Sequence, residues 1–274
     1  MTLKITRLHD WARRAKSVTN ERADYDAALK CHEAVDELID AYLESVFVFG
    51  QYQPEHPTMF KKPRQERDKA ILDPANALAG RSLTDPLPMP VVAHYLLQHP
   101  GPHWISENDG FACVEQEPFL LRGRSPRNNY EGPGAQLDFV LKSLPEQRPL
   151  FAQYKAAGDT PPFGALVQLL AHSAMLSNQA QMDRLLASCP DAGFQVPPAV
   201  PMDLCLLFNR NGRTKNPIFA MNWDDSLDLV RVICGKLLKS SEVSRYIRKI
   251  RLVQVGIFEG ALSFGEFPPA RVRA

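Results

Sequence analysis

The sequence predicts a mixed α/β fold in which one central sheet is flanked by helices. Stretches with apolar residues three and four positions apart indicate amphipathic helices, and short apolar runs bounded by turn residues indicate strands. The two patterns follow one another as helix, three strands, helix, strand, helix, strand. Such an order is typical of a sheet covered by helices. With 274 residues the chain is long enough for one domain with a sizeable core.

The N-terminal part, residues 1–50, is predicted to be helical. The segment ERADYDAALKCHEAVDELIDAYLESVFVF, from about Arg22 to Phe49, has helical apolar spacing and no internal proline or glycine, and Gly50 is a plausible stop. The next segment, 51–110, is predicted to be irregular because nine prolines lie between Gln51 and Pro102. Within it, VVAHYLLQ is the clearest short helix.

Residues 111–262 form the predicted α/β core. Three strands are expected in FACVEQEPFLLRG, QLDFVLKS and PLFAQYKAA, followed by one helix over PFGALVQLLAHSAMLSNQAQMDRLLAS. MDLCLLFNRNG is strand-like and ends in a turn sequence. A second helix over DDSLDLVRVICGKLLKSSEVSRYIRKI and a last strand over RLVQVGIFEGAL complete the core. The whole chain, 1–274, is therefore expected to be a single domain.

Composition narrows the classes of function. The formal net charge is +1, so no global field attracts nucleic acid and such binding would have to use local patches. Five scattered cysteines without a CxxC pair indicate reduced thiols, and no stretch of about eighteen apolar residues occurs. We therefore expect a cytoplasmic protein without a membrane partner. Zinc-hydrolase, P-loop, Rossmann and serine-hydrolase motifs are absent from the sequence.

Polar residues interrupt two of the predicted strands. Asp138 lies in QLDFVLKS, and Gln153 and Lys155 lie two residues apart in PLFAQYKAA, so both point to one face of their strand while Tyr154 points to the other. In a hairpin these side chains can converge on Asp138. A carboxylate and a second oxygen ligand can hold Mg²⁺, while a lysine can orient a water and neutralise charge on a phosphate.

This arrangement resembles the PD-(D/E)xK nuclease superfamily, whose pattern is an acid, a hairpin and then acid-x-lysine. LFAQYKAAGDTPPFGALVQLLAHSAML also looks like the lysine strand of that superfamily followed by its core helix, which often carries a glutamine where Gln168 stands. The resemblance covers roughly residues 111–262. It implies a restriction-endonuclease-like fold and a nuclease-like core.

The resemblance also implies an activity and roles for the residues. Asp138, the Gln153 carbonyl and the backbone carbonyl of Tyr154 would bind Mg²⁺ or Mn²⁺, Lys155 would position the attacking water, and Gln168 would support the strand by a hydrogen bond. The implied reaction is hydrolysis of DNA or RNA, with DNA the favoured partner. A homodimer is a possible assembly, as in many nucleases of this fold.

One position departs from the pattern of the superfamily. The usual second acid is Gln153 here, which removes one negative charge and should lower the affinity for metal. Members of the superfamily often contribute a glutamate from an N-terminal helix, so Glu33 and Glu37, four residues apart and hence on one helical face, are supporting candidates. A solvated acidic face is the alternative interpretation of that pair. Glu115 and Glu117 on the first predicted strand are rival donors.

Basic residues next to the predicted site offer a nucleic-acid contact. Arg122, Arg124 and Arg127 lie just upstream of Asp138 and could reach a phosphate backbone. Two further basic clusters, one near Arg210 and one from Arg245 to Arg251, are interpreted as solvated faces. Two alternatives to catalysis stay open: a nuclease-like module that has lost activity and binds nucleic acid or a protein, and an assembly subunit whose proline-rich segment wraps a partner.

Overall fold

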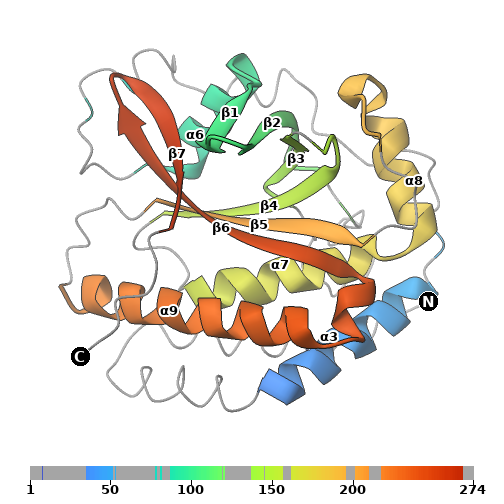
Figure 1. Ribbon diagram of the computed structural model, residues 1–274. Coiled ribbons are helices and arrows are strands. Elements are labelled where there is room, and N and C mark those ends of the chain that lie inside the picture. The colour runs from blue at the N-terminus through green and yellow to red at the C-terminus, as the bar shows by residue number, and fades with distance from the viewer. Residues whose placement is uncertain are drawn as a thin grey trace, which may run out of the picture.

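Figure 1 shows the computed structural model, in which a single twisted sheet crosses the molecule and helices pack against it. The structure describes residues 8, 35–51, 53, 78, 81, 87–118, 120, 137–144, 146–156, 162–195, 201–209 and 217–267, with the backbone alone for 217–226. Within this part the chain is mixed α/β, as the sequence predicts.

The sheet has seven strands in the order in which they follow along the chain. They are β1 (His103–Ser106), β2 (Asp109–Gln116), β3 (Phe139–Leu144), β4 (Pro149–Ala156), β5 (Met202–Asn209), β6 (Ile247–Phe258) and β7 (Ala261–Glu266). Strands β1 to β4 are antiparallel, β4, β5 and β6 are parallel, and β7 returns antiparallel to β6. The parallel strands are joined through helices, as parallel connections require.

Three helices, α3 (Val35–Gly50), α7 (Pro162–Leu176) and α9 (Pro217–Lys239), form a layer on one face of the sheet (Figure 1). Helix α7 is buried at every position except Gln168, because it lies against β4 and β5 with α3 and α9 beside it. Its sequence is accordingly apolar almost all round, as expected of a helix in the core of a protein. We call this side of the sheet the helix face.

The opposite side of the sheet carries a second core built around α6 (Met89–Gln98), and we call it the α6 face. Aromatic contacts link the two ends of the sheet here: the Phe264 ring of β7 lies 5.0 Å from His103 of β1 and 4.9 Å from Phe111 of β2, between ring centroids. The edges of the twisted sheet therefore approach each other over this face.

Several predicted boundaries differ from the structure. The helix predicted over 162–188 is two helices, because Asn178 ends the first and caps α8 (Gln179–Ser188): its side-chain oxygen accepts the Ala180 N–H at 2.8 Å. The helix predicted over 224–250 begins earlier and ends at Lys239, so the segment IRKI belongs to β6. The strand predicted over 251–262 is the second part of β6, a turn and the start of β7. Strand β1 lies within the segment predicted to be irregular, whereas α6 agrees with the helix expected over VVAHYLLQ.

The expected N-terminal helix is described only in its second part, α3, and residues 22–34 lie outside the described residues. The described cysteines, Cys113, Cys189, Cys205 and Cys234, are buried free thiols. None of the described helices combines the length and the apolar character needed to cross a membrane.

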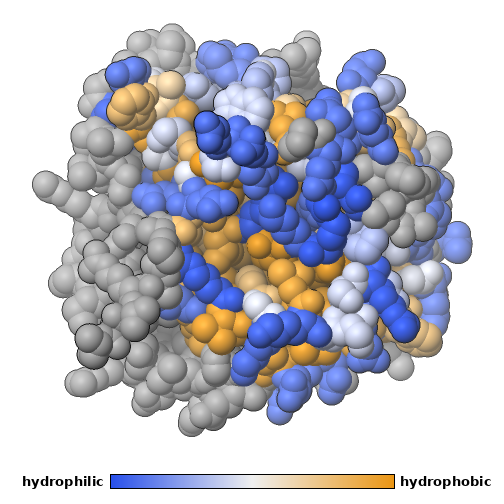
Figure 2. Space-filling view, in the orientation of Figure 1, coloured by the Kyte–Doolittle hydropathy of each residue, from blue (hydrophilic) through white to orange (hydrophobic). Residues whose placement is uncertain are grey.

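Figure 2 shows that apolar and hydrophilic side chains share the face of the molecule seen in Figure 1, with apolar ones gathered near its middle. Partly buried apolar residues that pack at the margin of the core on the helix face include Leu238, Ile250 and Leu252.

Candidate functional site

The candidate site lies where β3 and β4 part. Asp138 directly precedes β3, and Phe139, the first residue of β3, pairs with Ala152 of β4. Before Phe139 the backbone pairs with the residues that follow β2 and no longer with β4. Leu137 N–H donates to Pro118 O, and Glu117 N–H donates to Asp138 O. The Asp138 carboxylate then takes the place of a strand partner, since its Oδ2 accepts the Tyr154 N–H at 2.7 Å.

Gln153 contacts the same carboxylate oxygen. Its Nε2 donates to Asp138 Oδ2 at 2.5 Å, and the side chain, only 1% exposed, points to the helix face together with Phe151. The other amide atom, Oε1, is buried without a hydrogen-bond partner among the described residues. Burying an acceptor without a partner costs about 1 to 3 kcal/mol, so this oxygen marks a position suited to a ligand.

Lys155 lies on the same face of β4, two residues beyond Gln153, and its side chain is half-buried. Among the residues that the structure describes, it forms no hydrogen bond or ion pair. The structure thus brings Asp138, Gln153 and Lys155 to one face of the β3–β4 pair, as the sequence predicts.

Tyr154 points to the α6 face, also as predicted. Its hydroxyl donates to Leu87 O at 2.5 Å, and Leu87 N–H donates to the buried Asn209 Oδ1 at 3.2 Å. Asn209 Nδ2 in turn donates to Val255 O of β6 at 3.0 Å. The residue that binds Asp138 through its backbone therefore anchors the start of α6 through its side chain. Sequence reasoning missed this link, for which a lone asparagine at the end of an apolar strand was the only signal.

The supporting residues have mixed outcomes. Gln168 is half-buried on α7, and no hydrogen bond from its amide is found in the described part of the chain, so its supporting role stays a prediction. Glu37 is exposed on α3, which agrees with a solvated position. The remaining predicted residues, Glu33, Arg122, Arg124 and Arg127, lie outside the described residues.

The rival acids lie at the end of β2. Glu115 is 8% exposed, and its Oε1 accepts the backbone N–H of Gln116 at 3.1 Å. Glu117 is half-buried, has a φ of 49° and follows the last residue of the strand. A positive φ is uncommon for a residue other than glycine and here accompanies the departure of the chain from the sheet.

The donors at the site are oxygen atoms of the kind that Mg²⁺ and Mn²⁺ prefer. They are the Asp138 carboxylate, the buried Gln153 Oε1 and the Tyr154 carbonyl, which points toward β3 like the N–H of the same residue. These residues fit a hard divalent cation but supply a single formal charge. No group of three or more His, Cys, Asp or Glu side chains suited to a metal is found among the described residues.

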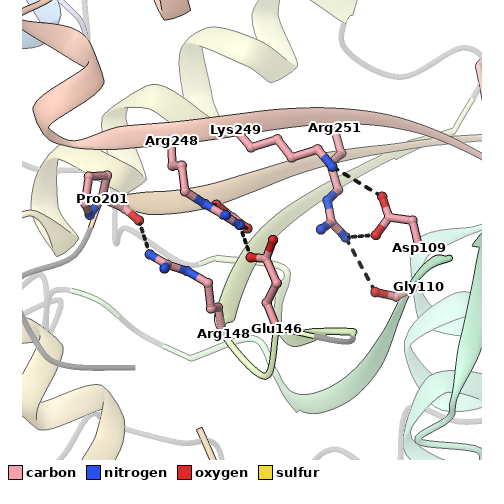
Figure 3. A network of polar contacts seen from close by, with 9 residues as sticks. Asp109, Gly110, Glu146, Arg148, Pro201, Arg248, Lys249 and Arg251 are labelled. Carbon is pink, nitrogen blue, oxygen red and sulfur yellow. Dashed lines mark hydrogen bonds and ion pairs between the residues drawn. The ribbon is translucent and has the colours of Figure 1, made fainter. Parts of the chain in front are cut away.

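Three residues of the basic cluster near the C-terminus, Arg248, Lys249 and Arg251, form ion pairs with acids of the chain (Figure 3). Arg248 binds the fully buried Asp203 with two nitrogens, at 2.7 and 2.5 Å, and also binds Glu146. Arg251 and Lys249 both contact Asp109, at 2.9 and 3.4 Å. The hydrogen bond from Arg248 lowers the pKa of Glu146 below its usual range. These residues tie β2, β5 and β6 together, so Arg248 and Arg251 do not form the solvated face expected from the sequence.

Comparison with protein-family models, with curated proteins and with solved structures finds no match to this chain.

Proposed function

We propose that the protein is a metal-dependent phosphodiester hydrolase of the PD-(D/E)xK type that acts on DNA or RNA. The observation that carries the proposal is the contact between Asp138 and Gln153 across parting strands, with Lys155 on the same face. The order of acid, hairpin, Gln-x-Lys and a following helix α7 supports it. The fold at this finer level, restriction-endonuclease-like, is part of the proposal.

Each residue of the proposed site has a separate role. Asp138, Gln153 Oε1 and the Tyr154 carbonyl would hold Mg²⁺ or Mn²⁺, which when bound lowers the pKa of water and stabilises charge on the scissile phosphate. Lys155 carries its charge on a half-buried stem, so its ammonium can donate to an attacking water or to a phosphate oxygen. The Tyr154 N–H fixes the orientation of the Asp138 carboxylate.

Cleavage of labelled single- and double-stranded DNA and RNA in the presence of Mg²⁺ or Mn²⁺ tests the proposal. Asp138→Asn and Lys155→Met should each lower the single-turnover rate at least about a hundredfold, because each removes a group that acts on developing charge. Lys236→Met, at an exposed position of α9, is the matched control and should cleave like the wild type.

A second candidate function is a non-catalytic module with the same fold that binds nucleic acid or a protein. The hydrogen bonds that Gln153 and Tyr154 donate to Asp138 favour it, since they satisfy the carboxylate within the chain. Folded protein that binds nucleic acid but cleaves none of the four substrates with either metal would establish this candidate over the first.

A further inference from the structure

Resting on the proposed function, we infer that Glu115 supplies the acid that the site lacks at Gln153 and is a ligand of the same divalent cation. A site with Asp138 as its one formal charge binds Mg²⁺ weakly, whereas two carboxylates together with neutral oxygens are a usual donor set for this ion. The acid therefore has to come from an element adjacent to β3 and β4.

A β-bulge in β2 places Glu115 on the face of the sheet that carries the site. Cys113 pairs with Leu141 and Glu115 pairs with Val140, so Val114 is an extra residue in the strand and forms a β-bulge. Cys113 lies on the α6 face, whereas Val114 packs against the core of the helix face. Glu115 shares the helix face with its partner Val140. Regular alternation would have sent it into the apolar core around α6.

The register sets the distance between the two acids. Asp138 lies two residues before Val140 on β3 and points to the same face, so Glu115 and Asp138 are diagonal neighbours. Diagonal pairs lie about 7 to 8 Å apart between Cα atoms, which long side chains can bridge. Glu115 is 8% exposed, so a cation between the two carboxylates would interact with it largely shielded from solvent.

A second, independent feature points to a ligand at this place. Gln153 Oε1 is buried and lacks a partner among the described residues, while Nε2 of the same amide touches Asp138. The unsatisfied oxygen therefore lies next to the Asp138 carboxylate. One cation bound by Asp138, Glu115 and Gln153 Oε1 would satisfy it and restore the two acids that a Mg²⁺ site of this kind uses.

Binding of Mn²⁺ to the full chain, followed by the electron paramagnetic resonance signal of free Mn²⁺, tests the inference without any nucleic acid. Glu115→Gln keeps the volume of the side chain and should raise the Kd at least about tenfold, as loss of a ligand requires. Glu37→Gln and Glu117→Gln test the rival acids and should each stay within about twofold of the wild type, whereas a raised Kd for either one with none for Glu115→Gln would overturn the inference. Gln153→Glu added to Glu115→Gln should restore binding, because it returns the missing charge to the site.

The outcomes separate this inference from the proposed function. Unchanged Mn²⁺ binding by Glu115→Gln, together with binding and cleavage lost in Asp138→Asn, would overturn the role of Glu115 and leave the nuclease intact. Wild type that neither binds Mn²⁺ nor cleaves would overturn both. If Glu115→Gln does not fold, crystals of the wild type soaked in Mn²⁺ decide: an anomalous peak must lie about 2.2 Å from a Glu115 oxygen, and a peak without that contact would overturn the inference.

Discussion

At the scale of single residues, isolated acids inside apolar strands have different partners and so different roles. Asp138 is bound by an amide and a backbone N–H at the place where two strands part, whereas Asp203 is bound by the Arg248 guanidinium and is fully buried. The sequence offers the same signal for both, a lone acid in an apolar run. Only the partner distinguishes a candidate ligand from a structural charge.

Removing the partner of Asp203 should destabilise the protein. Arg248→Met leaves a buried carboxylate unpaired and should lower the free energy of unfolding by about 2 to 3 kcal/mol, less than for a fully enclosed pair because solvent reaches Arg248. Urea denaturation measures the change. Adding Asp203→Asn removes the charge, so the double variant should recover part of the loss. Equal stability of Arg248→Met and the wild type would refute the structural role.

His103 should make stability depend on pH. Burial is the main cause that lowers its pKa, and the nearby His99 lowers it further, against the opposing effect of the contact between its Nε2 and His99 O. The folded protein therefore favours neutral His103. Its contribution is full above the unfolded pKa of about 6.5 and is lost as pH falls below that value toward the lower folded pKa. Thermal unfolding between pH 5 and about 7.5 should show this slope in the wild type and not in His103→Phe.

At the scale of elements, apolar spacing predicts which segments are helices or strands better than where they end. The strand with Gln153 and Lys155, the strand after α7 and the short helix α6 agree with their patterns because each buries a regular face. The break at Asn178 could not be predicted from spacing, since apolar residues continue on both sides of it. Its cause is tertiary: Asn178 Nδ2 donates to the carbonyls of Phe49 and Gly50 at the end of α3.

The candidate site, too, could be predicted only in part from the sequence. Hairpin spacing was enough to predict that Asp138, Gln153 and Lys155 share a face. It could not predict that Val114 forms a bulge, because the register with β3 decides which residue of β2 is extra. The ion pairs of Arg248 and Arg251 could not be predicted either, because their acidic partners lie far away in the sequence.

Asn178 should therefore stabilise both the end of α3 and the start of α8. Asn178→Ala removes the cap of α8 and leaves two carbonyls at the end of α3 without this donor, so the free energy of unfolding should fall by about 2 kcal/mol. Hydrogen exchange should accelerate in the first turn of α8 and the last turn of α3. Ser188→Ala, near the end of α8, is a control that leaves both contacts in place, and an effect as large as that of Asn178→Ala would contradict the proposed role.

At the scale of the whole molecule, the two faces of the sheet have separate tasks. The helix face carries Gln153, Lys155 and the helices α3, α7 and α9, while the α6 face is closed by aromatic contacts and by the ion pairs around Asp203 and Asp109. Tyr154 links the two faces, because its backbone N–H binds Asp138 and its hydroxyl binds Leu87 O next to α6. Within the described part of the chain, the parting of β3 and β4 is where we propose that the chemistry occurs.

The most direct test is the Mg²⁺ dependence of nucleic-acid cleavage by the wild type and by Gln153→Glu under single-turnover conditions. If Gln153 is a metal ligand, the wild type cleaves, and Gln153→Glu reaches half its maximal rate at a Mg²⁺ concentration at least about fivefold lower, because a carboxylate adds the missing charge. Absence of cleavage by both proteins, each folded and tested on all four substrates, would contradict a hydrolytic site at Asp138, Gln153 and Lys155.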